Sequence, residues 1–107
     1  MNLNKLEALA KAATPGRWDY YDDTASTGRI EIVALGKTVA RIYRSVPAED
    51  VPNAAFIAEA NPETILRLIE LVREMGEALV LANNSPAGDF TDKRVIEALA
   101  KYKELTK

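Results

Sequence analysis

A β-hairpin is predicted for the central segment Arg29-Ile30-Glu31-Ile32-Val33-Ala34-Leu35-Gly36-Lys37-Thr38-Val39-Ala40-Arg41-Ile42-Tyr43-Arg44. Its two arms, Arg29 to Leu35 and Thr38 to Arg44, are rich in the β-branched residues that favour strands. Gly36-Lys37 between the arms fits a two-residue turn, and glycine at the first central position suits type II′. Two neighbouring antiparallel strands therefore form the centre of the predicted fold.

A third strand and a helix are predicted on the N-terminal side of this hairpin. The segment from Arg17 to Asp22 is rich in aromatic residues, and the polar residues 23–28 form a longer connection into the hairpin. Before them, Leu3 to Ala13 has apolar residues at helical spacing, and Asn2 or Asn4 can cap the first turn. The sheet is therefore expected to be a three-stranded antiparallel meander preceded by one helix.

Three helices are predicted on the C-terminal side. A short helix of small residues, 54–60, ends at Asn61, because the residue before a proline is pushed out of the α region. Asn61-Pro62-Glu63 then combines a capping side chain, a proline at the first helical position and an acid at the positive end of the helix dipole. This second helix runs to about Ala82, and a last helix begins at Asp89 or Thr91.

These elements predict an α+β class: an N-terminal helix, a three-stranded antiparallel β-meander, and three helices packed on one face of the sheet. With 107 residues, the chain has the length of a single small α+β domain that spans residues 1–107. Trp18 and Phe56 are the large side chains expected in its core, and Phe56 is expected to bury against the sheet with Ile57.

The composition argues against several classes of function. The chain has no cysteine and no histidine, so it lacks a thiolate nucleophile, a cysteine-type zinc site and the commonest general base. We expect no enzyme activity, no catalytic residue, no metal and no cofactor. The net charge of −2 argues against a general nucleic-acid binder. No apolar run is long enough to span a membrane and residues 1–5 do not resemble a signal peptide, so we expect a cytoplasmic protein.

Aromatic and basic residues gather in the predicted strands. Such residues dominate the hot spots of protein interfaces, and they can also stack on bases and pair with phosphates. A third interpretation is structural: Trp18 and Tyr20 face the helices as core, and the arginines are solvated. The candidates for binding a partner are Tyr21, Arg29, Arg41, Tyr43 and Arg44.

The long helix carries an apolar stripe with heptad spacing. Its surplus apolar surface can pair with a second copy of the chain, giving a homodimer, or it can pack within one chain. Gly76 lies within this stripe and marks either a close helix approach or a kink, because glycine costs about 1 kcal/mol of helix stability relative to alanine. The candidates for self-association are Ile65, Leu68, Val72, Met75 and Leu79.

An acidic set lies in the predicted sheet region. Binding of a hard cation needs six or more oxygens in a defined loop, and no such pattern is present. The expected role is a solvated charge cluster that protects a sheet edge against aggregation. The set consists of Asp19, Asp22, Asp23 and Glu31.

Two segments carry a family resemblance. The first is Leu6-Glu7-Ala8-Leu9-Ala10-Lys11-Ala12-Ala13-Thr14-Pro15-Gly16-Arg17-Trp18, and it resembles the opening of the Ead-like family of lambdoid phage early-region accessory proteins. The second is Asn53-Ala54-Ala55-Phe56-Ile57-Ala58-Glu59-Ala60-Asn61-Pro62 with Ile65, Leu66 and Leu68, and it is similar to the family's second signature. The resemblance implies a phage or prophage origin and host-facing accessory work, without catalytic residues. Residues 19–52 share no pattern with the family, so they leave the particular target open.

The predicted function is stoichiometric binding of a protein by a non-enzymatic phage or prophage accessory protein. The target is a host or phage protein, and inhibition of a host or anti-phage defence factor is the expected consequence. The alternative is a dimeric nucleic-acid-binding regulator, in which the long helix pairs two copies and doubles a modest arginine face.

Overall fold

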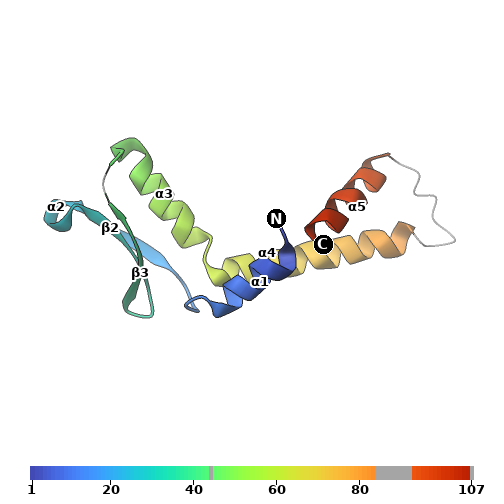
Figure 1. The fold of residues 1–107 in the computed structure, drawn as a ribbon, viewed down its shortest axis with the longest axis horizontal. Coiled ribbons are helices and arrows are strands. Elements are labelled where there is room, and N and C mark those ends of the chain that lie inside the picture. The colour runs from blue at the N-terminus through green and yellow to red at the C-terminus, as the bar shows by residue number, and fades with distance from the viewer. Residues whose placement is uncertain (44, 84–92, 107) are drawn as a thin grey trace. The chain divides into compact units, whose positions relative to one another are not determined.

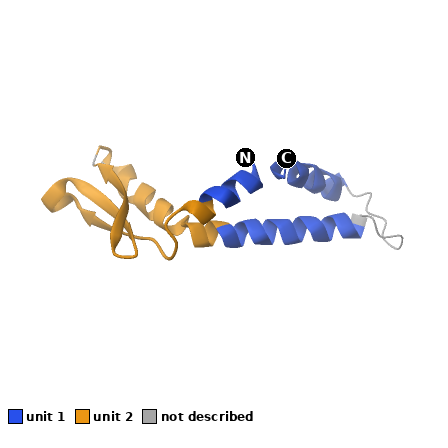
Figure 2. Cartoon of the chain, turned by 60° about the horizontal axis from the view of Figure 1, so that its bottom comes forward, with its two compact units in different colours: residues 1–9, 66–107 blue, residues 10–65 orange. Residues whose placement is uncertain are grey.

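The computed structural model describes residues 1–43, 45–83 and 93–106 of the chain (Figure 1). It confirms the α+β class, with an N-terminal helix, a three-stranded antiparallel sheet and further helices in that order. The chain divides into two compact units (Figure 2). We call residues 10–65 the sheet unit, and residues 1–9 with 66–107 the helical unit.

The sheet has the order β1-β2-β3, and both pairings are antiparallel. The strands are β1 (Asp19–Asp23), β2 (Arg29–Ala34) and β3 (Lys37–Tyr43). The register changes between Ile32 and Val33 of β2, because Ile32 pairs with Ala40 and Val33 pairs with Thr38. This leaves Val39 as the extra residue of a β-bulge in β3.

Helix α3 (Pro47–Glu59) packs on one face of this sheet. Ile30 and Ile32 of β2 are fully buried on that face, and Ala54 and Ala58 of α3 are buried opposite them. Phe56 does not join them: it is 73% exposed, so the expectation that it buries against the sheet is wrong. Phe56 is two residues from each alanine and therefore lies on the opposite side of the helix. Small residues, which let the backbone approach the sheet closely, make this contact.

Helix α3 begins seven residues before the predicted start at residue 54. Pro47 occupies its first turn, where a missing N–H costs nothing. The carboxylate of Asp50 is buried at 4% exposure, and its Oδ2 accepts hydrogen bonds from the backbone N–H groups of Ser45 at 2.8 Å and Val46 at 3.1 Å. Asp50 thus ties the connection after β3 to the first turn of α3.

The hairpin turn differs from the prediction. Its central residues are Leu35 and Gly36, because Ala34 pairs with Lys37. Both have positive φ, 52° for Leu35 and 75° for Gly36, which is the pattern of type I′. The predicted Gly36-Lys37 turn of type II′ is therefore displaced by one residue. The reason is that β3 begins at Lys37, one residue before the predicted strand.

The connection between β1 and β2 contains a short helix, α2 (Thr24–Thr27). Oδ1 of Asp22 accepts a hydrogen bond from the N–H of Thr24 at 3.0 Å. Gly28, with φ 71°, ends the turn in the left-handed region. The polar segment 23–28, which was predicted as a longer connection into the hairpin, therefore contains a short helix.

Helix α1 (Leu3–Ala12) agrees with the predicted N-terminal helix within one residue. Oδ1 of Asn2 accepts a hydrogen bond from the N–H of Lys5 at 3.0 Å, so Asn2 supplies the predicted cap. After the helix, the half-buried ring of Trp18 donates from Nε1 to the carbonyl oxygen of Thr14 at 2.9 Å. Trp18 thus folds back toward the end of α1.

Helix α4 (Pro62–Asn83) begins where the sequence predicts. Oδ1 of Asn61 accepts a hydrogen bond from the N–H of Thr64 at 3.0 Å, which confirms the cap. Its Nδ2 donates to the carbonyl oxygen of Ala58 at 3.0 Å. The buried Asn61 side chain therefore serves the last turn of α3 and the first turn of α4 together.

In the helical unit, α4 holds both residues 1–9 and helix α5 (Lys93–Leu105). Arg73 donates to Oε2 of Glu7 at 2.6 Å and to Oδ1 of Asn4 at 2.7 Å. The ring of Tyr102 lies directly over Gly76. Gly76 thus marks a close helix approach, one of the two alternatives that the sequence left open. The predicted start of the last helix, at Asp89 or Thr91, lies outside the described residues.

Candidate functional site

The strand register gathers most of the predicted partner-binding residues on one face of the sheet. Residues opposite each other in antiparallel strands point to the same side. Tyr21 and Arg41 pair with Glu31 from the two outer strands, and Tyr43 pairs with Arg29. These side chains lie on the face opposite α3, since their neighbours in β2 are buried toward that helix. We call Tyr21, Arg29, Glu31, Arg41 and Tyr43 the open face.

The fifth predicted residue, Arg44, lies outside the described residues. The other four lie on the open face, and the sequence identified them as aromatic or basic residues of the predicted strands. Glu31 is the member that sequence reasoning did not place among the partner-binding candidates.

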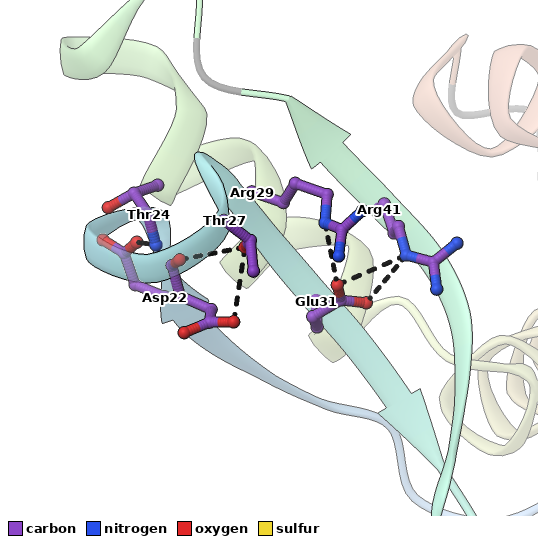
Figure 3. Close-up of polar contacts among 7 residues, drawn as sticks. Asp22, Thr24, Thr27, Arg29, Glu31 and Arg41 are labelled. Carbon is purple, nitrogen blue, oxygen red and sulfur yellow. Dashed lines mark hydrogen bonds and ion pairs between the residues drawn. The ribbon is translucent and has the colours of Figure 1, made fainter.

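Glu31 is the centre of a charge cluster (Figure 3). Nε of Arg41 lies 3.3 Å from Oε1, with the geometry of a hydrogen bond, and 3.2 Å from Oε2. Nε of Arg29 lies 3.3 Å from Oε1. The Glu31 side chain is only 6% exposed, whereas those of Arg29 and Arg41 are 32% and 48% exposed. The sequence predicted that Glu31 belongs to a solvated acidic cluster, and this prediction is wrong. Glu31 is the buried partner of two arginines.

The Glu31 cluster combines the hydrogen bond from Nε of Arg41 with ion pairs to both arginines. Nε of Arg29 and Oε2 of Glu31 are buried and make no hydrogen bond. A carboxylate between two guanidinium groups is electrostatically favourable. Removing the charge of Glu31 would leave two positive charges close together, and removing the arginines would leave a buried carboxylate without a partner. The cluster fixes the long Arg29 and Arg41 side chains on the sheet surface.

The two tyrosines of the open face are accessible. Tyr21 on β1 is 52% exposed and Tyr43 on β3 is 66% exposed, one on each side of the central strand. An aromatic ring with a polar tip beside a fixed guanidinium is the composition of a protein-interface hot spot. Asp19 and Asp23 occupy the same side of β1, so the described part of this face has no excess of positive charge.

The remaining acids of the predicted cluster serve local structure. Asp19 forms an ion pair with Arg17 at 3.2 Å, and Oδ2 of Asp23 accepts from Oγ1 of Thr27 at 3.3 Å. Asp22 accepts the hydrogen bond from the N–H of Thr24 at the start of α2, as described above. Among the described residues, no group of three or more potential metal-ligating side chains is close enough to hold a metal ion.

The predicted self-association residues fall into different surroundings. Val72, Met75 and Leu79 line a cavity of about 260 Å³ between α4 and α5 of the helical unit. Leu68 is 52% exposed, and Ile65, in the sheet unit, is half-buried. The cavity is completed by Gly76, Ala98, Lys101, Tyr102 and Leu105.

Leu71 is an exposed apolar residue that the sequence analysis missed. It is 49% exposed, close to the values of 52% for Leu68 and 59% for Met75. Its spacing, three residues after Leu68 and four before Met75, is the signal that could have identified it.

Comparison with known proteins adds no relative. No protein-family model, curated protein or solved structure matches the chain. No helix in the described ranges combines the length and the apolarity that crossing a membrane requires.

Proposed function

We propose that this protein binds a protein target stoichiometrically through the open face of its sheet, without catalysing a reaction. The observation that carries the proposal is the exposure of Tyr21 and Tyr43 on either side of the Glu31 cluster. Tyrosine contributes a large contact area at a low cost in conformational entropy, because it has only two rotatable side-chain angles. Two exposed rings on one rigid sheet face thus supply anchors for a partner.

The charge cluster supports a protein target over a nucleic acid. Phosphate binding draws on cationic side chains that release counterions. Arg29 and Arg41 are both held by Glu31, and Asp19 and Asp23 share their face. Guanidinium groups fixed in this way can still donate hydrogen bonds to carbonyl oxygens of a partner, because each has donors beyond its Nε.

The nature of the target is proposed from the family resemblance. Residues 6–18 and 53–68 resemble segments of Ead-like accessory proteins of lambdoid phages. A phage accessory protein without catalytic residues acts by occupying a surface of its target. We therefore propose that the target is a host or phage protein in the bacterial cytoplasm, and that binding inhibits a host or anti-phage defence factor.

The test is capture of the target by matched variants. The tagged protein is purified from bacterial host cells with and without nuclease, and bound proteins are quantified by mass spectrometry. The variants are Tyr21→Ala and Tyr43→Ala. The control is Phe56→Ala, which removes an aromatic ring of similar exposure from α3 rather than from the open face.

We expect one protein in stoichiometric amount that resists nuclease. Its recovery should fall by roughly tenfold or more in each tyrosine variant, as expected for a hot-spot residue, and should stay unchanged in Phe56→Ala. Equal recovery in all three variants would show that the open face is not the binding surface. Recovery that depends on nucleic acid would instead favour the dimeric regulator.

A further inference from the structure

Helices α4 and α5 lie next to each other in the helical unit (Figure 2), and a cavity of about 260 Å³ that is open to solvent lies between them. We call it the α4–α5 cavity. Gly76 and Ala98 are small, which leaves this space beside the Tyr102 ring. The apolar side chains that line it are Val72, Met75, Leu79 and Leu105. Apolar cavities between the helices of a bundle are common binding sites for small molecules.

Water is a poor occupant of the α4–α5 cavity. A water molecule held in a protein needs about two to four polar partners, and these walls are almost entirely apolar. An apolar group that displaces such poorly held water gains affinity. A cavity of about 150 Å³ is large enough for benzene. The α4–α5 cavity therefore has room for a larger apolar group, such as the alkyl chain of octanoate.

The polar groups at the cavity indicate the head group of its ligand. The lining residues with polar side chains are Lys101 and Tyr102, and an ammonium group and a phenol hydroxyl can both donate hydrogen bonds. Among the described residues, no acid lines the cavity. Lys101 is exposed, and within the described ranges it forms no ion pair. A lysine in this situation lays its alkyl stem along the apolar surface and keeps its positive charge in water.

The acidic residues of α4 and α5 that are near in sequence face elsewhere or have partners. Glu74 and Glu77 are exposed and lie on the far side of α4, since they fall between the lining residues, which recur every three or four positions. Glu97 of α5 pairs with Lys93 at 3.7 Å, and Glu104 takes part in an interaction within the chain. The charge of Lys101 is therefore available to a ligand of opposite charge.

We propose that the α4–α5 cavity binds an anionic amphiphile, a carboxylate with a short or medium alkyl chain. The chain lies between the helices and the carboxylate lies beside Lys101. Burial of the apolar chain supplies most of the affinity. The exposed ion pair with Lys101 selects the head group, since such pairs contribute little affinity themselves. This inference stands on the helical unit and is independent of the open face.

The first experiment titrates the protein with sodium octanoate and follows its amide NMR spectrum. We expect saturable binding with a Kd on the order of 1 mM, the range of a ligand with about ten non-hydrogen atoms. The shifts should gather in α4 and α5. Hexanoate, which is shorter by two methylene groups, should bind roughly tenfold more weakly. A lack of saturation, or shifts confined to the sheet unit, would overturn the proposal.

The second experiment tests the head group with octylammonium, which has the same chain and the opposite charge. Octanoate should bind several-fold more tightly than octylammonium, and Lys101→Glu should reverse this preference. The matched control is Lys103→Glu, a charge change at an exposed lysine of α5 that does not line the cavity. Equal affinity of the two ligands for the native protein would overturn the anionic head group. An equal effect of Lys103→Glu would overturn the role of Lys101.

The third experiment fills the cavity. Ala98→Leu should weaken octanoate binding by roughly tenfold or more, because the larger side chain occupies the space of the alkyl chain. Ala100→Leu, which changes an exposed alanine of α5, is the control and should leave binding unchanged. Circular dichroism melting checks that both variants remain folded. Unchanged octanoate binding by a folded Ala98→Leu protein, or a dimer in sedimentation velocity that octanoate does not dissociate, would overturn the proposal.

Discussion

Tyr102 of α5 packs its ring directly over Gly76 of α4, so closely that a Cβ atom at Gly76 would overlap the ring. Glycine is therefore required at this position by the neighbouring helix and not by its own backbone, because no positive φ is found there. The contact explains why a long helix retains a residue that weakens it. A single methyl group added at Gly76 would therefore disturb the packing of α5 against α4.

Gly76→Ala should lower the free energy of unfolding of the helical unit by about 1–3 kcal/mol, the usual cost of overpacking. The better helix propensity of alanine, worth about 1 kcal/mol, acts in the opposite direction. Urea denaturation and hydrogen exchange of α5 measure the effect. In a Tyr102→Ala background the same change should be neutral or stabilising. A stabilising effect of Gly76→Ala in the native background would contradict the close packing.

Glu31→Gln should lower the free energy of unfolding by about 1–3 kcal/mol, because it leaves Arg29 and Arg41 facing each other without the buried carboxylate. Urea denaturation followed by circular dichroism measures it. Asp19→Asn is the matched control, since Asp19 is an exposed acid on the same side of the sheet. Its effect should stay within about 0.5 kcal/mol. Similar losses for both variants would mean that burial of Glu31 has no special role.

Leu35→Asn should raise the free energy of unfolding by about 0.5–1 kcal/mol, because Asn-Gly is the preferred pair for a type I′ turn. Leu35 has φ 52° and is 71% exposed, so the change relieves the backbone and removes little packing. Thermal denaturation measures the gain. Leu35→Val, a β-branched residue that resists positive φ, should be destabilising. If the asparagine and valine variants have equal melting temperatures, the turn assignment is incorrect.

Asn61→Ala should lower the free energy of unfolding by about 1–2 kcal/mol, because it removes the cap of α4 and leaves the Ala58 carbonyl oxygen without its side-chain donor. Asn53→Ala, which changes an exposed asparagine on α3, is the control and should have little effect. Chemical denaturation compares the two. Equal losses would show that the Asn61 side chain makes no specific contribution.

The sequence predicts elements well where local chemistry defines them. Asn61-Pro62-Glu63 fixes the start of α4, and Asn2 caps α1, because a side chain three residues away can satisfy a free backbone N–H. Four of the five partner-binding candidates, chosen as aromatic or basic residues of the predicted strands, lie together on the open face. The two-residue period of a strand is the reason that paired residues share a face.

Other features depend on pairing that a single sequence does not display. The hairpin turn is centred on Leu35-Gly36, and not on the predicted Gly36-Lys37, because Ala34 pairs with Lys37. The sequence did not indicate this position, because leucine is not a residue type that favours positive φ. Phe56 is exposed because α3 contacts the sheet through alanines, although its size suggested a core residue. Both outcomes follow from contacts between elements rather than from residue propensity.

The sequence by itself determined the α+β class, the order of the elements and the helix caps, because these follow from local periodicity and from hydrogen bonds within a few residues. The tertiary structure alone decided that Glu31 is buried between two arginines and that Gly76 receives the Tyr102 ring. It also decided that Leu71 of α4 is 49% exposed. Burial depends on which residues from distant parts of the chain cover a side chain, and that is set only when the elements pack.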